Sequence, residues 1–132
     1  MSADRKTARL ALAALLESGI STFQAVYDHV ALKFGGLSPV ATVESAGSQA
    51  GAGALSNDRT HALLVTIYWL WTDDAEDGFD DLSAEVFDLL LANGSNAAWD
   101  SLELDENFSV TDYGQDADGN VYRYEQIRVL IW

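Results

Sequence analysis

The sequence predicts an α+β domain with a mixed or antiparallel sheet of about five strands and two helices packed on one face. Two segments, 3–18 and 73–93, have the apolar pattern of helices, and shorter segments rich in β-branched and aromatic residues have that of strands. The 132 residues fit a single domain, and 48% hydrophobic residues supply its core. With only two helices, both can cover one face, which leaves the other face to solvent or to a partner.

The first helix is expected over residues 3–18, with Ser2 as its cap and Asp4 in its first turn. Alanine and leucine occupy most of its circumference, which predicts a helix covered on more than one side. In so short a chain, part of that cover could come from another subunit.

Three basic residues, Arg5, Lys6 and Arg9, stand in the first turns of this helix, where the helix dipole disfavours positive charge. They are either a solvated helix end or a basic contact for an acidic neighbour, which could be another copy of the chain. The same charges before the run LALAALL resemble a signal peptide, but Glu17 stands where cleavage would occur, and we expect no export.

Two short strands are expected next, at 22–27 and 40–45. Residues 46–58 are rich in Gly, Ala and Ser and have no apolar periodicity, which predicts a long flexible loop. Long loops inside compact domains are often functional. We therefore take Gln49 and Leu55 as candidate partner contacts, with a loop free of any role as the alternative.

Residues 61–72 form the strongest predicted strand, and they are apolar at both alternating sets of positions. Both faces of this strand should therefore be covered, which favours a partner on the open face. Trp69 and Trp71 fall on one face, either as core residues or as interface anchors. The segments 107–113 and 121–132 are expected to close the chain as a hairpin.

The second helix, expected over 73–93, carries eight acidic residues and no basic one between positions 73 and 88. Acids four residues apart on a helix repel by roughly 0.2–0.5 kcal/mol per pair. This face is either solvated or an acidic contact surface, and its candidate contact residues are Asp77, Asp81 and Glu85.

Charge and motifs exclude several function classes. The formal net charge of −14 disfavours tight binding of free DNA or RNA, which needs clustered Lys and Arg. No cysteine is present, no apolar run reaches the roughly 18–20 residues of a membrane span, and the two histidines stand in no ligand pattern. No nucleophile motif, phosphate loop or dinucleotide fingerprint occurs. We therefore expect no enzyme, no cofactor and no metal.

The segment 114–125 (GQDADGNVYRYE) is the strongest metal candidate, because Asp116, Asp118 and Glu125 fall at ligand positions of a calcium loop. Gly114 stands where the first ligand should be, and strands flank the segment in place of helices. Asp-Gly between strands is typical of a tight turn. We therefore expect a hairpin turn here.

The layout as a whole resembles the tail terminator, or tail completion, proteins of long-tailed bacteriophages. The resemblance covers nearly the full length and rests on the order of six segments: ARLALAALLESGI, TFQAVYDHV, SPVATVES, LLVTIYWLW, LLLANG and VYRYEQIRVLIW. The acidic stretch DDAEDGFDD is not a general feature of that family.

This resemblance implies a structural virion protein, assembled in the host cytoplasm, that forms a homo-oligomeric ring, typically of six copies. The ring would cap the head-proximal end of the tail tube, stop tube polymerisation and join the tube to the head–tail connector or stopper. DNA would pass through its lumen without specific binding, and a negatively charged wall suits that passage.

Three other functions stay open. A head–tail stopper or another neck component would share the size and the ring. An acidic inhibitor that mimics DNA would use the carboxylates of residues 73–88. A calcium-dependent module would use residues 114–125.

Overall fold

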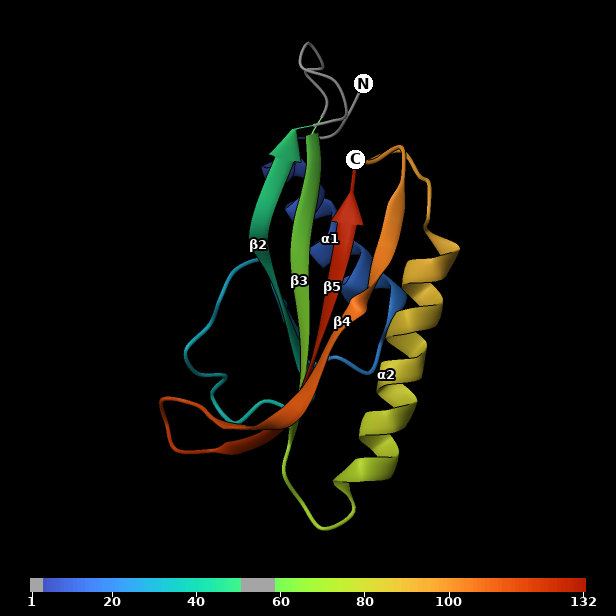
Figure 1. Cartoon of the computed structure of the whole chain (residues 1–132). Helices are drawn as coiled ribbons and strands as arrows, with labels where there is room; N and C mark the ends of the chain where they lie inside the picture. Colours follow the sequence, from blue (N-terminus) through green and yellow to red (C-terminus); the bar gives the residue numbers. More distant parts are fainter. Residues whose placement is uncertain (1–3, 51–58) are drawn as a thin grey trace.

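The chain folds into two helices and one five-stranded mixed sheet, described by a computed structural model for residues 4–50 and 59–132 (Figure 1). The strand order is β1-β2-β3-β5-β4, with β1 parallel to β2 and every other pair antiparallel. The predicted fold class is confirmed. The elements in chain order are α1 (Arg5–Gly19), β1 (Ala25–Tyr27), β2 (Val40–Ala50), β3 (Arg59–Leu70), α2 (Ala75–Ala92), β4 (Leu102–Gln115) and β5 (Val121–Ile131).

Helix α1 begins one residue after its cap, Asp4. The Asp4 carboxylate accepts hydrogen bonds from the Thr7 backbone at 2.8 Å and from its hydroxyl at 2.7 Å. These bonds lower the pKa of Asp4 and satisfy a donor of the first turn. Asp4 is thus the cap and not a first-turn residue; the expected cap, Ser2, lies outside the described residues.

One stripe of α1 faces the sheet, formed by Ala8, Leu12, Ala13 and Leu16. Leu10 on another side is 39% exposed. Within the chain, the sheet and α2 cover this side of the helix, and cover by another subunit stays a prediction.

Several predicted boundaries move because strand pairing extends or shortens the elements. The first strand covers only residues 25–27. Residues 46–50, expected in a flexible loop, continue β2 past an irregularity between Ser45 and Gly47 and pair with β3. The last hairpin begins at Leu102, earlier than the expected residue 107, because its first residues pair with the end of β5.

Helix α2 packs its apolar stripe of Phe79, Leu82, Val86 and Leu90 on the sheet. Gly78 lets the helix approach closely, since a Cβ atom there would lie 2.7 Å from the Trp69 ring. Leu91, outside this stripe, is exposed. Both helices thus share one apolar core on the same face of the sheet, and we call this the helix face.

The opposite face of the sheet, which we call the open face, is covered only at one end. Residues 28–39 cross it there, and Phe34 packs against Val40 and Tyr122. The Tyr122 hydroxyl donates to the Leu37 carbonyl at 3.0 Å, which holds this loop on the sheet. The chain itself therefore supplies part of the cover that the sequence assigned to a partner.

Candidate interaction surfaces

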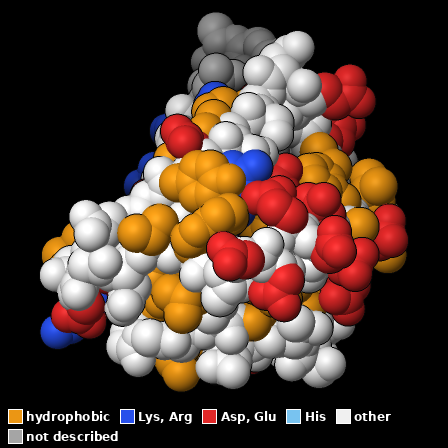
Figure 2. Space-filling view, turned by 90° about the horizontal axis from the view of Figure 1, so that it is seen from below, with side chains coloured by type: hydrophobic (Ala, Val, Ile, Leu, Met, Phe, Trp, Pro, Cys, Tyr) orange, Lys and Arg blue, Asp and Glu red, His pale blue; other side chains and the backbone are white. Residues whose placement is uncertain are grey.

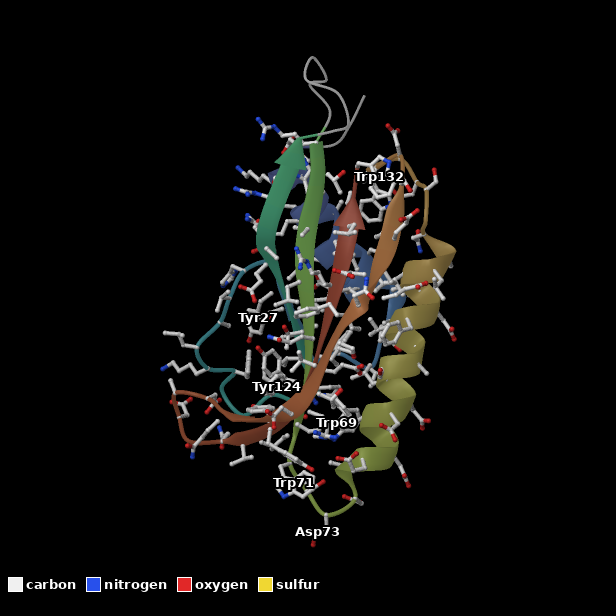
Figure 3. All side chains as sticks on the ribbon, in the orientation of Figure 1. Tyr27, Trp69, Trp71, Asp73, Tyr124 and Trp132 are labelled. Atoms are coloured by element: carbon white, nitrogen blue, oxygen red, sulfur yellow. The ribbon has the colours of Figure 1, made fainter. Side chains whose placement is uncertain are left out.

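The four basic residues at one end of the molecule define a surface that we call the basic edge: Arg5, Lys6, Arg9 and Arg59. The first three lie in the opening turns of α1, and Arg59 opens β3 opposite Ala50. Arg5 Nη1 donates to Ser48 Oγ, and Arg9 Nη1 donates to Ser45 Oγ, each at 3.4 Å. The start of α1 therefore lies against the part of β2 that contains these two serines. Figure 3 shows nitrogen-tipped side chains projecting from this side of the sheet.

The basic edge conflicts with local helix preference. Its positive charges meet the positive end of the α1 dipole, and the first turn of α1 contains no acidic residue. Three of the charges, on Arg5, Lys6 and Arg59, have exposed side chains and are accessible to a partner. Arg9 is partly buried, so its role is divided between packing and charge.

We call a second charged surface the acidic edge. It lies along α2 and along β4, the outermost strand at the end of the strand order away from β2. It consists of exposed carboxylates: Asp77, Asp80, Asp81, Glu85 and Asp88 on α2, and Glu103, Glu106 and Asp112 on β4. The three helical residues singled out from the sequence, Asp77, Asp81 and Glu85, are all among them. Their carboxylates are therefore available to a neighbour.

Charge is segregated along the chain as well as in space. Residues 60–122 contain no Lys or Arg, and they form most of β3, all of α2 and all of β4. Strand order then carries α2 and β4 away from β2 and the start of α1. Viewed along the strands in Figure 2, carboxylates crowd one side of the molecule. The two edges thus have opposite charge and face different directions.

The predicted tryptophan pair divides between two environments. Trp69 packs into the helix-face core beside α2. Trp71 follows the end of β3, is 41% exposed, and contacts Tyr113 edge-on at 5.1 Å between ring centroids. Figure 3 shows it beside Asp73 at the lower end of the molecule. Trp69 is a core residue, and Trp71 is available to a partner.

The two loop candidates have different outcomes. Gln49 belongs to β2 and pairs with Thr60, so it lies in a strand and not in a loop. Leu55 lies outside the described residues.

The lower end of the molecule carries exposed apolar side chains that the sequence analysis missed, and we call this surface the apolar end. Six of the nine exposed large hydrophobic side chains in the described residues belong to it: Val30, Leu32, Leu37, Trp71, Tyr113 and Val121. They come from the 28–39 loop, the end of β3 and the β4–β5 hairpin, and Figure 2 shows hydrophobic side chains gathered on this end. Clustered exposed apolar side chains mark interaction sites.

A pocket of about 250 Å³ opens on the open face next to the apolar end. Its lining combines the 28–39 loop, β3 and the terminal hairpin: Ala31, Leu32, Phe34, Tyr68, Gly114, Gln115, Asp116, Tyr122, Tyr124 and Gln126. Burial raises the pKa of both Tyr68 and Tyr122 above the ordinary tyrosine value. Tyr122 and Tyr124 stand two residues apart in β5, and this spacing on one face is the sequence signal that could have indicated the cluster.

The segment proposed as a calcium loop forms the turn of the terminal hairpin, as expected. Asp116 Oδ1 accepts hydrogen bonds from the backbone of Asp118 and Asn120, at 3.0 and 2.9 Å. Gly119 has φ +86°, which favours glycine. Within residues 4–50 and 59–132, no group of three or more His, Cys, Asp or Glu side chains is placed to hold a metal ion.

Asp28 and His29 form a hydrogen bond of 2.9 Å at the start of the crossing loop, which lowers the pKa of Asp28. The His29 side chain is 65% exposed, as a solvated loop residue would be. None of the helices in the described part of the chain is long and apolar enough to cross a membrane.

Comparison with models of protein families and with curated proteins finds no match to this sequence.

Proposed function

We propose that the chain is a structural protein that assembles head-to-tail with its own copies into a ring on the head-proximal end of a phage tail tube. The ring stops tube polymerisation, receives the head connector and lets DNA pass through its lumen. The sequence resemblance to tail terminator proteins supports this role. The observation that carries the assembly step is the placement of the basic and acidic edges on different sides of one domain.

Two complementary surfaces on one chain favour a closed ring over a twofold dimer. A twofold contact uses the same patch on both copies, so a twofold contact through either edge alone would bring like charges together. A head-to-tail contact instead joins the basic edge of each copy to the acidic edge of the next. Repetition of that contact closes into a ring when the rotation between copies divides a full turn.

The net negative charge that remains after the edges pair suits the passage of DNA. After the two edges pair, each copy still carries an excess of acidic residues, since 21 acids face 7 bases. A ring of such copies has a strongly negative field, which repels phosphate and prevents adhesion of DNA to the lumen. The apolar end leaves each ring with an exposed surface for a protein above or below it.

Charge reversal tests the ring directly. Arg5→Glu with Lys6→Glu makes the basic edge acidic, and Asp77→Lys with Asp81→Lys and Glu85→Lys makes part of the acidic edge basic. Each variant alone should stay monomeric in multi-angle light scattering at concentrations where the wild type assembles, because like charges then meet. Arg9 is left unchanged because its partial burial would confuse folding with assembly.

Mixing the two variants is the decisive step. In the mixture, a copy whose basic edge was made acidic can bind a copy of the other variant on each side. Assembly should therefore return, and only with even copy numbers, because the two variants must alternate. A control variant, Asp118→Lys, changes an exposed charge in the turn of the terminal hairpin, outside both edges, and should assemble like the wild type. Failure of the mixture to assemble, with both variants folded by circular dichroism, would reject the edge pairing.

The acidic helix also supports a second candidate, an inhibitor that mimics DNA. The exposed carboxylates of α2 are the observation in its favour. A strict monomer that displaces DNA from a DNA-binding enzyme would favour it. Binding to isolated capsid connectors but not to tail tubes would favour a head–tail stopper instead.

A further inference from the structure

We propose that the pocket between the 28–39 loop and the terminal hairpin binds an arginine or lysine side chain of a protein that docks on the apolar end. This site belongs to each copy separately, so it does not depend on the ring. It names the chemistry by which an axial partner is recognised: a cationic side chain flanked by apolar residues.

Aromatic rings provide the first part of the argument. Phe34, Tyr68 and Tyr122 pack with ring centroids 4.7 to 6.2 Å apart, and Tyr124 lies 6.0 Å from Tyr68. Phe34 and Tyr122 are buried and fix the wall, while Tyr68 and Tyr124 are partly exposed. The negative face of an exposed aromatic ring attracts a cation. Figure 3 shows Tyr124 on this part of the sheet, beside the crossing loop.

A carboxylate in the lining provides the second part. Asp116 Oδ1 is engaged in the turn, but its Oδ2 is shielded from solvent and has no hydrogen-bond partner among the described residues. The charge of Asp116, after burial, contributes to the raised pKa of Tyr122, so its field reaches the pocket. None of the residues that line the pocket is Lys or Arg. The pocket is therefore negative and lacks an internal counter-charge.

The rim provides the third part, because it selects a protein segment over a free ion. Leu32 is 78% exposed and Val30 is 56% exposed, and both lie in the loop that forms one wall. The Leu32 carbonyl accepts a hydrogen bond of 2.8 Å from the Ala117 backbone, which ties this wall to the hairpin turn. The pocket is thus held open by its own backbone contacts, and its rim suits apolar neighbours of the bound side chain.

The test uses N-acetyl-argininamide as probe and N-acetyl-citrullinamide, its neutral isostere, as comparison. Titration of the full chain, followed by amide and aromatic NMR signals, should give saturable shifts at Gly114, Gln115 and Tyr124 with arginine. The citrulline compound should bind at least about fivefold more weakly, because it lacks the cation–π contact and the charge pair. Shifts confined to the acidic helix 75–92, or equal shifts with citrulline, would overturn the proposal.

Variants separate the pocket from general attraction to an acidic protein. Tyr124→Leu removes a partly exposed ring, and Asp116→Asn removes the charge while keeping an oxygen for the turn. Each should weaken the arginine probe by about threefold or more. Asp88→Asn is the matched control, because Asp88 is an exposed carboxylate of α2 outside the pocket lining and its loss should leave probe affinity unchanged. Equal weakening by Asp88→Asn, or unchanged affinity in Asp116→Asn, would reject the site.

Discussion

The two faces of the sheet use the same strands for different purposes. On β3, the side chains that point to the helix face, Leu63, Val65 and Ile67, are completely buried. The neighbours that point the other way include Thr66, Tyr68 and the partly exposed Leu64. The helix face therefore carries the stabilising core, and the open face is left with polar and aromatic groups suited to binding.

Truncation of one side chain on each face tests this contrast and has the largest expected effect. Phe79→Ala removes a 1%-exposed ring between α2 and the sheet and should lower the free energy of unfolding by about 3–5 kcal/mol. Leu64→Ala on the open face should cost about 1 kcal/mol, since less apolar area is lost. Urea unfolding measures both. Equal losses would contradict a one-sided core, and Phe79→Leu gives an intermediate value if the alanine variant does not fold.

Two arginines of β5 provide a second comparison, since Arg123 lies on the helix face and Arg128 on the open face. Arg123 Nε donates to Glu76 at 2.9 Å, and its guanidinium lies 4.5 Å from the Tyr113 ring centroid. Arg128 Nη1 is 3.8 Å from Asp105, and its Nε has no hydrogen-bond partner among the described residues.

Arg123→Met should therefore destabilise the protein by about 1–2 kcal/mol, a value kept low because Glu76 is half exposed to solvent. Arg128→Met, the matched control, should change stability by less than about 0.5 kcal/mol. The difference should shrink in high salt, which screens the ion pair. A larger loss at Arg128 would place a structural ion pair on the open face and weaken the contrast.

The smallest effect is a pH dependence on the open face. Burial raises the pKa of Tyr68 above its ordinary value of 10.0, so the folded state holds this proton more tightly than the unfolded state. The stability that this difference contributes is complete below pH 10 and is lost as pH rises above it. Tyr68→Phe should therefore lose less stability between pH 9 and pH 11 than the wild type. A flat wild-type profile would contradict the prediction.

Much of the architecture was predictable because it follows from local patterns. The apolar spacing of residues 73–93 and the aromatic alternation near position 65 predicted a helix and a strand close to those observed. Asp-Gly in the last hairpin predicted its turn, which the backbone of residues 116–120 forms. Each of these signals lies within a few residues, where backbone preference and side-chain period act directly.

The largest differences from expectation involve partners distant in sequence. Residues 46–50 lack a strand pattern of their own, yet they extend β2 because β3 offers them hydrogen-bonding partners. No helix or strand was expected between residues 27 and 40, yet Phe34 anchors the 28–39 loop on the sheet through Tyr122, far away in the chain. The candidate basic and acidic residues were visible in the sequence, while their separation onto different sides was not.

The sequence by itself determined the fold class, the two helices, the acidic charge and the chemical character of each segment, because these depend on composition and short-range period. Only the tertiary structure decided the strand order, the one-sided core, the aromatic pocket and the placement of the two charged edges. These features arise when segments far apart in the chain compete for the same neighbours, and burial in the folded domain selects among the pairings.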